Sequence, residues 1–204
     1  MRGKKKNEKE LLREDNAIIL DYLSQGYVNS KTNHFDGRPV AQAIGVEHFM
    51  LLELFPQEGV DLDLQEKVYI GSDRKKRDKI KRVNRRLNLD NLSKTASLEL
   101  DYAIQDIVKA NEEKYVDFFN NSQGVSLRKH SLELLPGIGK KHMLRIIEAR
   151  EKKPFESFDD IVDRVTGIIN PGVLVANRIK QELDITRADK NKYYLFVKDP
   201  RSNE

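Results

Sequence analysis

The stretch LPGIGKKHMLRIIEAR, Leu135–Arg150, decides the fold of the second half of the chain. Its first five residues hold a proline and two glycines, and two lysines follow directly. Glycine permits a positive φ, which a tight turn often requires. The segment beyond the lysines has apolar residues at the spacing of one helix face: Met143, Leu144, Ile146 and Ile147. The stretch therefore predicts a tight turn that leads into an amphipathic helix.

The segment before this turn, Ser126–Leu135, has apolar positions of its own and predicts a short helix upstream. With the hydrophobic-Gly-hydrophobic-Gly pattern of the turn, the arrangement resembles the helix-hairpin-helix family. Backbone N–H groups after such a turn lie at a helix N-terminus, where the helix dipole favours an anion. We expect phosphate binding here without reading of base edges. The candidate residues are Gly137, Ile138, Gly139, Lys140 and Lys141. A turn that only joins two helices is the alternative.

A second, degenerate copy of this pattern follows. Ser157 resembles the start of a capping box and predicts a helix over Phe158–Val165. The sequence VTGIIN comes next, and then a predicted helix over Val173–Leu183. Ile169 stands where the second glycine of the first copy stands, and no lysine pair follows. We therefore expect the second hairpin to be a packing partner of the first.

The N-terminal half has a different pattern, with short β-branched and apolar runs separated by turn residues. The strand predictions are Ala17–Leu23, Val40–Val46, His48–Phe55, Lys67–Gly71 and one strand within Lys79–Leu89. The segment Asn29–Pro39 is dense in turn formers and predicts a surface loop. Several short strands with turns between them predict a small antiparallel barrel or sandwich.

A strongly basic run follows the fourth predicted strand. Nine of the thirteen residues from Arg74 to Arg86 are lysine or arginine, and only Asp78 opposes them. Such a density of like charge repels itself, so it favours a phosphate-binding stripe over a purely structural element. The stripe comprises Arg74, Lys75, Lys76, Arg77, Lys79, Lys81, Arg82, Arg85 and Arg86. The alternative is a solvated segment beside acidic groups of the same protein.

Alternation along a strand would place Lys79, Lys81 and Arg85 on one charged face and Ile80 inward.

Two helices then follow, over residues 94–110 and 112–120, with Ser93 as the N-cap of the first. Tyr193–Val197 predicts a terminal strand. The expected organisation is a basic tail at 1–15, a β domain at 16–90, connecting helices at 91–121, a tandem hairpin domain at 126–185 and a C-terminal strand and tail at 186–204.

The order of these parts resembles an archaeal family catalogued as domain of unknown function 655. The stretches that carry the resemblance are ILDYL, KVYIGSDRKKRDKIKRV, YVDFFN, HSLELLPGIGKKHM, PFESFDDI and YYLFV. The resemblance implies an α+β protein with an N-terminal OB-like β-barrel and a C-terminal tandem helix-hairpin-helix. It also implies an archaeal, cytoplasmic RNA- or DNA-binding protein near the translation apparatus.

Composition excludes several classes of activity. Cysteine is absent, so thiolate nucleophiles, disulfides and thiolate metal sites are excluded. No stretch approaches eighteen apolar residues, and the charged N-terminus is unlike a secretory signal. The four histidines, His34, His48, His130 and His142, are scattered without a close ligand pair. We find no phosphate-binding P-loop and no Gly/Pro-rich stretch around Asp184 like that of helix-hairpin-helix glycosylases. The expectation is a protein without catalysis, cofactor or metal.

The leading hypothesis is therefore a non-catalytic, largely sequence-independent RNA-binding protein that binds ribosomal or other structured RNA. Tyr22, Tyr27, Phe35 and Phe49 could stack on unpaired bases, although core packing explains Phe49 equally well. One alternative is a DNA-binding protein, because helix-hairpin-helix units often follow duplex DNA. Another is an assembly factor whose acidic protein partners contact the basic run.

Overall fold

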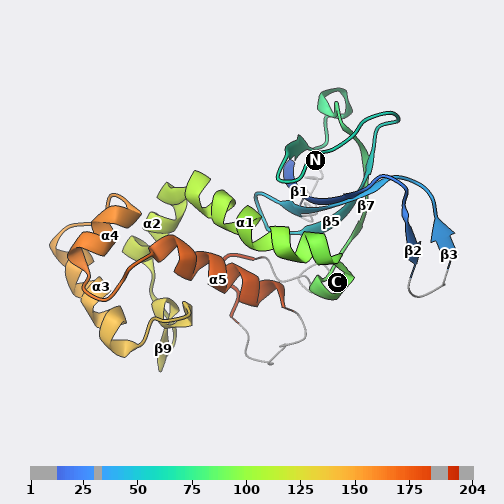
Figure 1. Ribbon diagram of the computed structural model, residues 1–204. Helices are drawn as coiled ribbons and strands as arrows, with labels where there is room; N and C mark the ends of the chain where they lie inside the picture. The colour runs from blue at the N-terminus through green and yellow to red at the C-terminus, as the bar shows by residue number, and fades with distance from the viewer. Residues whose placement is uncertain (1–12, 30–33, 185–192, 198–204) are drawn as a thin grey trace, which may run out of the picture.

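The computed structural model describes residues 13–29, 34–184 and 193–197. Most of the predicted basic tail lies outside these ranges. The described chain is an α+β fold in which a curled antiparallel sheet packs against a group of helices (Figure 1).

The sheet has five strands in the order β6-β1-β4-β5-β7, and every neighbouring pair is antiparallel. The strands are β1 (Asn16–Leu23), β4 (Val40–Gly45), β5 (Leu51–Pro56), β6 (Lys67–Tyr69) and β7 (Ile80–Arg86). Register shifts interrupt the β1–β4 pair once and the β5–β7 pair twice. Bulges of this kind bend a strand and increase its twist, so the sheet curls into a half-barrel. The five predicted strands are present, with their ends shifted by a few residues.

Both faces of this sheet are buried, and alternation along the strands divides them. Ala17 and Ile19 point into the half-barrel, where they pack with Leu52, Leu54 and Ile80. Their neighbours Ile18 and Leu20, with Ile44 and Leu51, face the other way and join the helical core. The helix on this second face is α1 (Lys94–Ala110), which crosses the sheet and continues towards the remaining helices (Figure 1).

A two-stranded ribbon, β2 (Tyr27–Asn29) and β3 (His34–Asp36), projects from the sheet between β1 and β4 (Figure 1). Of the segment predicted as a surface loop, Asn29–Pro39, the ribbon includes Asn29 and His34–Asp36. Two single 3₁₀ turns flank β7: η1 (Arg74–Lys76) precedes it and η2 (Leu89–Asn91) follows it. The half-barrel therefore presents its basic run on an edge strand and on the turn before that strand.

The helical region contains α2 (Glu112–Asn121), α3 (Lys140–Lys152), α4 (Phe158–Arg164) and α5 (Pro171–Leu183). The two predicted N-caps are confirmed: the Ser93 side chain accepts the N–H of Ala96, and the Ser157 side chain accepts that of Asp160. Such caps satisfy N–H groups that have no partner within the helix.

The predicted helix over Ser126–Leu135 is wrong. The segment instead forms a short ribbon, β8 (Gly124–Ser126) and β9 (Lys129–His130), and one 3₁₀ turn, η3 (Ser131–Leu134). His130 Nδ1 accepts the N–H of Leu132, and Glu133 accepts the N–H of His130, so the helical turn begins only after His130. Pro136 then disfavours helical geometry at the residue before it. Between His130 and Pro136 the chain therefore forms a single 3₁₀ turn.

The predicted strand over Tyr193–Val197 is also wrong, because its backbone donors have another acceptor. Leu195, Phe196 and Val197 all donate their N–H groups to the carboxylate of Glu182, at 2.8–2.9 Å. Glu182 is buried on α5 and also accepts from Arg178 Nε at 2.7 Å. The segment docks on the helices through this carboxylate.

Glu14 shows how burial affects a carboxyl group at the edge of the sheet. It is 4% exposed and accepts the N–H groups of Glu47, His48 and Met50. Burial raises the pKa of Glu14 to about 7 from an ordinary value of 4.5. Between these two values the folded protein holds a proton that the unfolded chain releases.

We therefore expect the contribution of Glu14 to the free energy of unfolding to fall as the pH rises from about 4.5 to 7. Glu14→Gln carries no charge and should remove this dependence. Urea unfolding across this pH range should show the wild type losing about 2 kcal/mol relative to the variant. Parallel stability profiles for the two proteins would contradict this description of Glu14.

Candidate nucleic-acid interface

The turn before α3 is a compact, anchored loop. Ile138 N donates to Leu135 O at 3.0 Å, which closes a four-residue turn with Pro136 second and Gly137 third. Gly137 has φ +91°, which favours glycine, and proline suits the second position of such a turn. Ile138 is 5% exposed and fixes the turn to the hydrophobic core.

The start of α3 has no side-chain cap. Gly139 is the N-cap residue, with φ −96° and ψ 177°, a conformation open to any residue. A Cβ added at Gly139 would have nothing within 4 Å. The fold therefore does not require glycine here, and the first N–H groups of α3 have no side-chain acceptor. Lys140 and Lys141 are exposed, and neither forms an ion pair within the described residues.

The turn before α5 has the same four-residue turn but is one residue longer before its helix begins. Ile168 N donates to Val165 O at 3.2 Å, Gly167 has φ +95°, and Ile168 is 5% exposed. Here, however, Asn170 caps the helix by accepting the N–H of Val173 at 3.1 Å. Pro171 occupies the first helical position and has no N–H to offer. The start of α5 is therefore closed by a side-chain cap, whereas the start of α3 is open because it has none.

Each turn lies against the helix that follows the other turn. Arg145 of α3 donates to Thr166 O in the second turn at 2.8 Å, and a Cβ at Gly167 would lie 2.7 Å from His142 Nε2. A Cβ at Gly137 would lie 3.6 Å from Leu174 Cδ2 of α5. The two turns and helices therefore form one packed unit.

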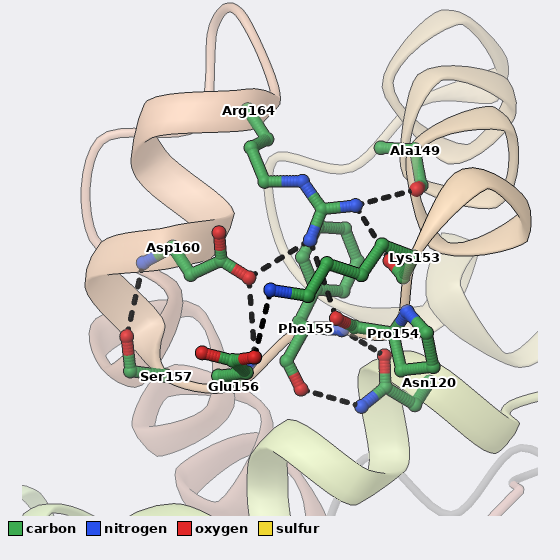
Figure 2. A network of polar contacts seen from close by, with 9 residues as sticks. All are labelled: Asn120, Ala149, Lys153, Pro154, Phe155, Glu156, Ser157, Asp160 and Arg164. Carbon is green, nitrogen blue, oxygen red and sulfur yellow. Dashed lines mark hydrogen bonds and ion pairs between the residues drawn. The ribbon is translucent and has the colours of Figure 1, made fainter.

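The opposite end of α3 is closed by Arg164, as Figure 2 shows. Its Nη2 donates to the carbonyl oxygens of Ala149 and Lys153 at 2.6 and 2.5 Å, and its Nη1 donates to Asp160 at 2.8 Å. The guanidinium also stacks on the ring of Phe155, 4.7 Å from its centroid. Carbonyl groups at a helix C-terminus need such partners. The helix is thus fixed at its C-terminus and open at its N-terminus.

The structure divides the predicted basic stripe into paired and unpaired groups. Arg85 binds the buried Glu53 through Nε and Nη2, both at 2.9 Å, and Lys79 pairs with Glu66. Arg77 Nε donates to Gly71 O at 2.7 Å. Ile80 is fully buried, as the alternation predicts. The remaining exposed cations that form no ion pair within the described chain are Arg74, Lys75, Lys76, Lys81 and Arg82, of which Arg82 stacks on an aromatic ring.

A groove beside the stripe contains an aromatic residue that the sequence argument missed. Phe55 of β5 lies opposite Arg82 of β7 in the sheet register. The guanidinium carbons of Arg82 and Arg38 lie 4.6 and 5.0 Å from the centroid of the Phe55 ring. With Tyr22 and Lys81 they line a groove of about 560 Å³. The signal was present in the sequence as an aromatic at the end of a predicted strand, but only the register shows that the basic run lies beside it.

The aromatic residues proposed for stacking have different positions. Tyr22 lines the groove beside Phe55, and Tyr27 donates its hydroxyl to Glu53 at 3.1 Å. Phe49 is fully buried and belongs to the hydrophobic core. The side chain of Phe35 lies outside the described residues. Tyr22 and Phe55 are therefore the aromatic residues that line the groove beside the basic stripe.

The stripe and the open helix start lie far apart in the molecule. In Figure 1, β7 and η1 belong to the sheet at one end, and α3 lies at the other end beyond α1 and α2.

Within the parts of the chain that the structure describes, no group of three or more His, Asp or Glu residues could hold a metal ion. No described helix is long and apolar enough to cross a membrane.

This architecture matches known proteins over almost its whole length. The family model described as "Protein of unknown function (DUF655)" matches residues 13–198. The chain belongs to the DUF655 family. It is 43% identical over 198 residues to the uncharacterized protein MJ0038 of Methanocaldococcus jannaschii, covering 97% of this chain and 86% of that protein.

A crystal structure of another DUF655 member, Af1531 from Archaeoglobus fulgidus, has a similar fold. The TM-score is 0.80 at 42% identity, covering 90% of this chain and 99% of the Af1531 chain. Neither relative's name states an activity.

The two glycines of the first turn should differ in their effect on stability. Gly137→Ala places a Cβ in a positive-φ conformation, which we expect to lower the free energy of unfolding by about 1–2 kcal/mol. Gly139→Ser meets no steric conflict and supplies a side-chain cap, so it should leave the free energy of unfolding unchanged or slightly higher. Chemical denaturation of both variants measures the difference. Equal losses would show that the turn geometry described above is wrong.

Proposed function

We propose that this protein binds structured RNA without catalysis and largely without sequence preference, through a helix-hairpin-helix at the start of α3 and the basic stripe of an OB-like barrel. The observation that supports this most strongly is the uncapped start of α3. Gly139 offers no cap, the conformation does not demand glycine, and Lys140 and Lys141 stand beside the open N–H groups.

The second hairpin has a side-chain cap that the first one lacks. A Ser, Asp or Asn at the N-cap accepts an N–H of the first helical turn, which glycine cannot do, although glycine lowers helix stability by only about a few tenths of a kcal/mol relative to them. Asn170 supplies such a cap after a turn that is one residue longer. An anionic ligand would satisfy the open groups of α3, since the amides donate hydrogen bonds and the dipole and lysines supply positive potential. Phosphate oxygens of a nucleic-acid backbone fit these requirements.

The half-barrel supports RNA as the nucleic acid. Phe55, Tyr22 and the cations around them form a groove suited to an unpaired base next to a phosphate. Unpaired bases and backbones at fixed separations are features of folded RNA such as ribosomal RNA. The unpaired stripe residues and the α3 start would then contact different segments of one folded RNA.

A matched pair of substitutions tests the role of the α3 start. Gly139→Asp should cap α3 and leave stability unchanged or higher, while its carboxylate repels phosphate and lowers RNA affinity at least about tenfold. Ile169→Asp introduces the same charge in the second hairpin, one residue before the Asn170 cap, where Ile169 is 88% exposed. It should change affinity less than about twofold. Fluorescence anisotropy with a folded RNA hairpin at fixed salt measures both.

Equal effects of the two substitutions would show that the α3 start has no special role. Unchanged binding by Gly139→Asp would remove this contact from the proposal entirely.

Duplex DNA is the second candidate ligand, because two similar turns packed side by side could contact the two strands of one duplex. Competition between duplex DNA and folded RNA for the protein at one salt concentration separates the two ligands. We expect RNA to displace DNA at a lower concentration than DNA displaces RNA. Equal competition would contradict the RNA preference while leaving phosphate binding intact.

A further inference from the structure

The tip of the β8–β9 ribbon exposes a leucine completely. Leu127 has a relative exposure of 106%, the highest of the exposed large apolar side chains in the described chain. Burying a leucine is worth about 1.5–3 kcal/mol, and none of that is realised here. Single exposed apolar residues are common on protein surfaces. Exposure alone therefore does not assign a function to Leu127, and the residues around it have to be considered.

The base of this ribbon is held firmly by α2, α3 and the turn that follows. Ser131 donates both its N–H and its hydroxyl to Gln123 O, at 2.9 and 2.6 Å. Arg150 of α3 donates to Phe119 O at 2.8 Å and to the Ser122 hydroxyl and carbonyl at 2.9 and 2.8 Å. These bonds fix the base of the ribbon to α2 and α3, so the ribbon projects Leu127 from a defined place on the helical region.

That place belongs to the same unit as the open start of α3. The chain passes from β9 into η3, which packs on both β9 and α3, and then enters the turn at Leu135–Ile138 (Figure 1). Arg128 and Lys129, beside Leu127, are exposed and form no ion pair within the described residues. A lone apolar side chain followed by two unpaired cations is complementary to a base step with phosphates next to it.

We propose that Leu127 is a wedge that enters an interrupted step of an RNA helix, such as a bulge or junction. The side chain packs against the face of an unstacked base, and Arg128 and Lys129 bind phosphates next to that base. Apolar side chains are known to enter base steps in this way, and a step that is already interrupted costs least to open. The inference rests on the proposed RNA binding, and it makes interrupted RNA helices the preferred ligand over unbroken ones.

The test uses the full chain and two RNA hairpins that have the same base-paired sequence. One hairpin carries a short bulge, and the other is unbroken. A 2-aminopurine beside the bulge reports loss of stacking through increased fluorescence. The wild type should bind the bulged RNA more tightly and raise its fluorescence. Leu127→Ala should bind the bulged RNA about tenfold more weakly, without the fluorescence change, while its affinity for the unbroken hairpin stays unchanged. Leu98→Ala, on α1 and 70% exposed, is the matched control and should behave like the wild type.

The outcomes separate this inference from the proposed function. If Leu127→Ala keeps the bulge preference and the fluorescence change, or weakens binding to both RNAs equally, the wedge is wrong and RNA binding stands. If Lys140→Glu with Lys141→Glu leaves both affinities unchanged, or the wild type binds neither RNA, the proposed function fails.

Discussion

The packing of α1 is the interaction on which the rest of the structure depends. Its buried face, which includes Leu100, Ile104 and Ile107, contacts β1 of the sheet and α5 of the helical region. A single hydrophobic cluster therefore extends from the convex face of the half-barrel to the core beneath the two hairpins. Lys180 of α5 pairs with Asp101 of α1 at the edge of this contact, at 2.6 Å. Through α1 the basic stripe and the α3 start are held at a fixed separation, which suits a ligand that is itself folded.

Local hydrogen bonds and ion pairs determine which helix ends and which cations already have partners within the protein and which stay available to a ligand. Ser93, Ser157 and Asn170 close the starts of α1, α4 and α5, and Arg164 closes the end of α3. Glu53 and Glu66 neutralise two members of the basic stripe. At the start of α3 and in the stripe turn η1, the described groups that stay without a partner are hydrogen-bond donors or cations. This one-sided chemistry is what favours an anionic ligand.

The sequence predicted the parts of the fold that local chemistry determines. The Ser93 and Ser157 caps, the five strands and the inward position of Ile80 follow from side-chain type and periodicity alone. The failures arose where distant groups compete for the backbone. Nothing in the sequence near Tyr193–Val197 reveals that Glu182 takes its N–H groups. The pairing of Phe55 with Arg82 likewise depends on a register shift between two strands.

The most direct test of the account is hydrogen exchange of backbone amides, measured by NMR on the free protein and on its complex with a folded RNA. The amides of Lys140, Lys141 and His142 begin α3 without a side-chain cap, so they should exchange quickly in the free protein and become protected in the complex. The amides of Gly172 and Val173 at the start of α5 should change little. Protection at α5 equal to that at α3, or no protection at Lys140–His142, would contradict the account.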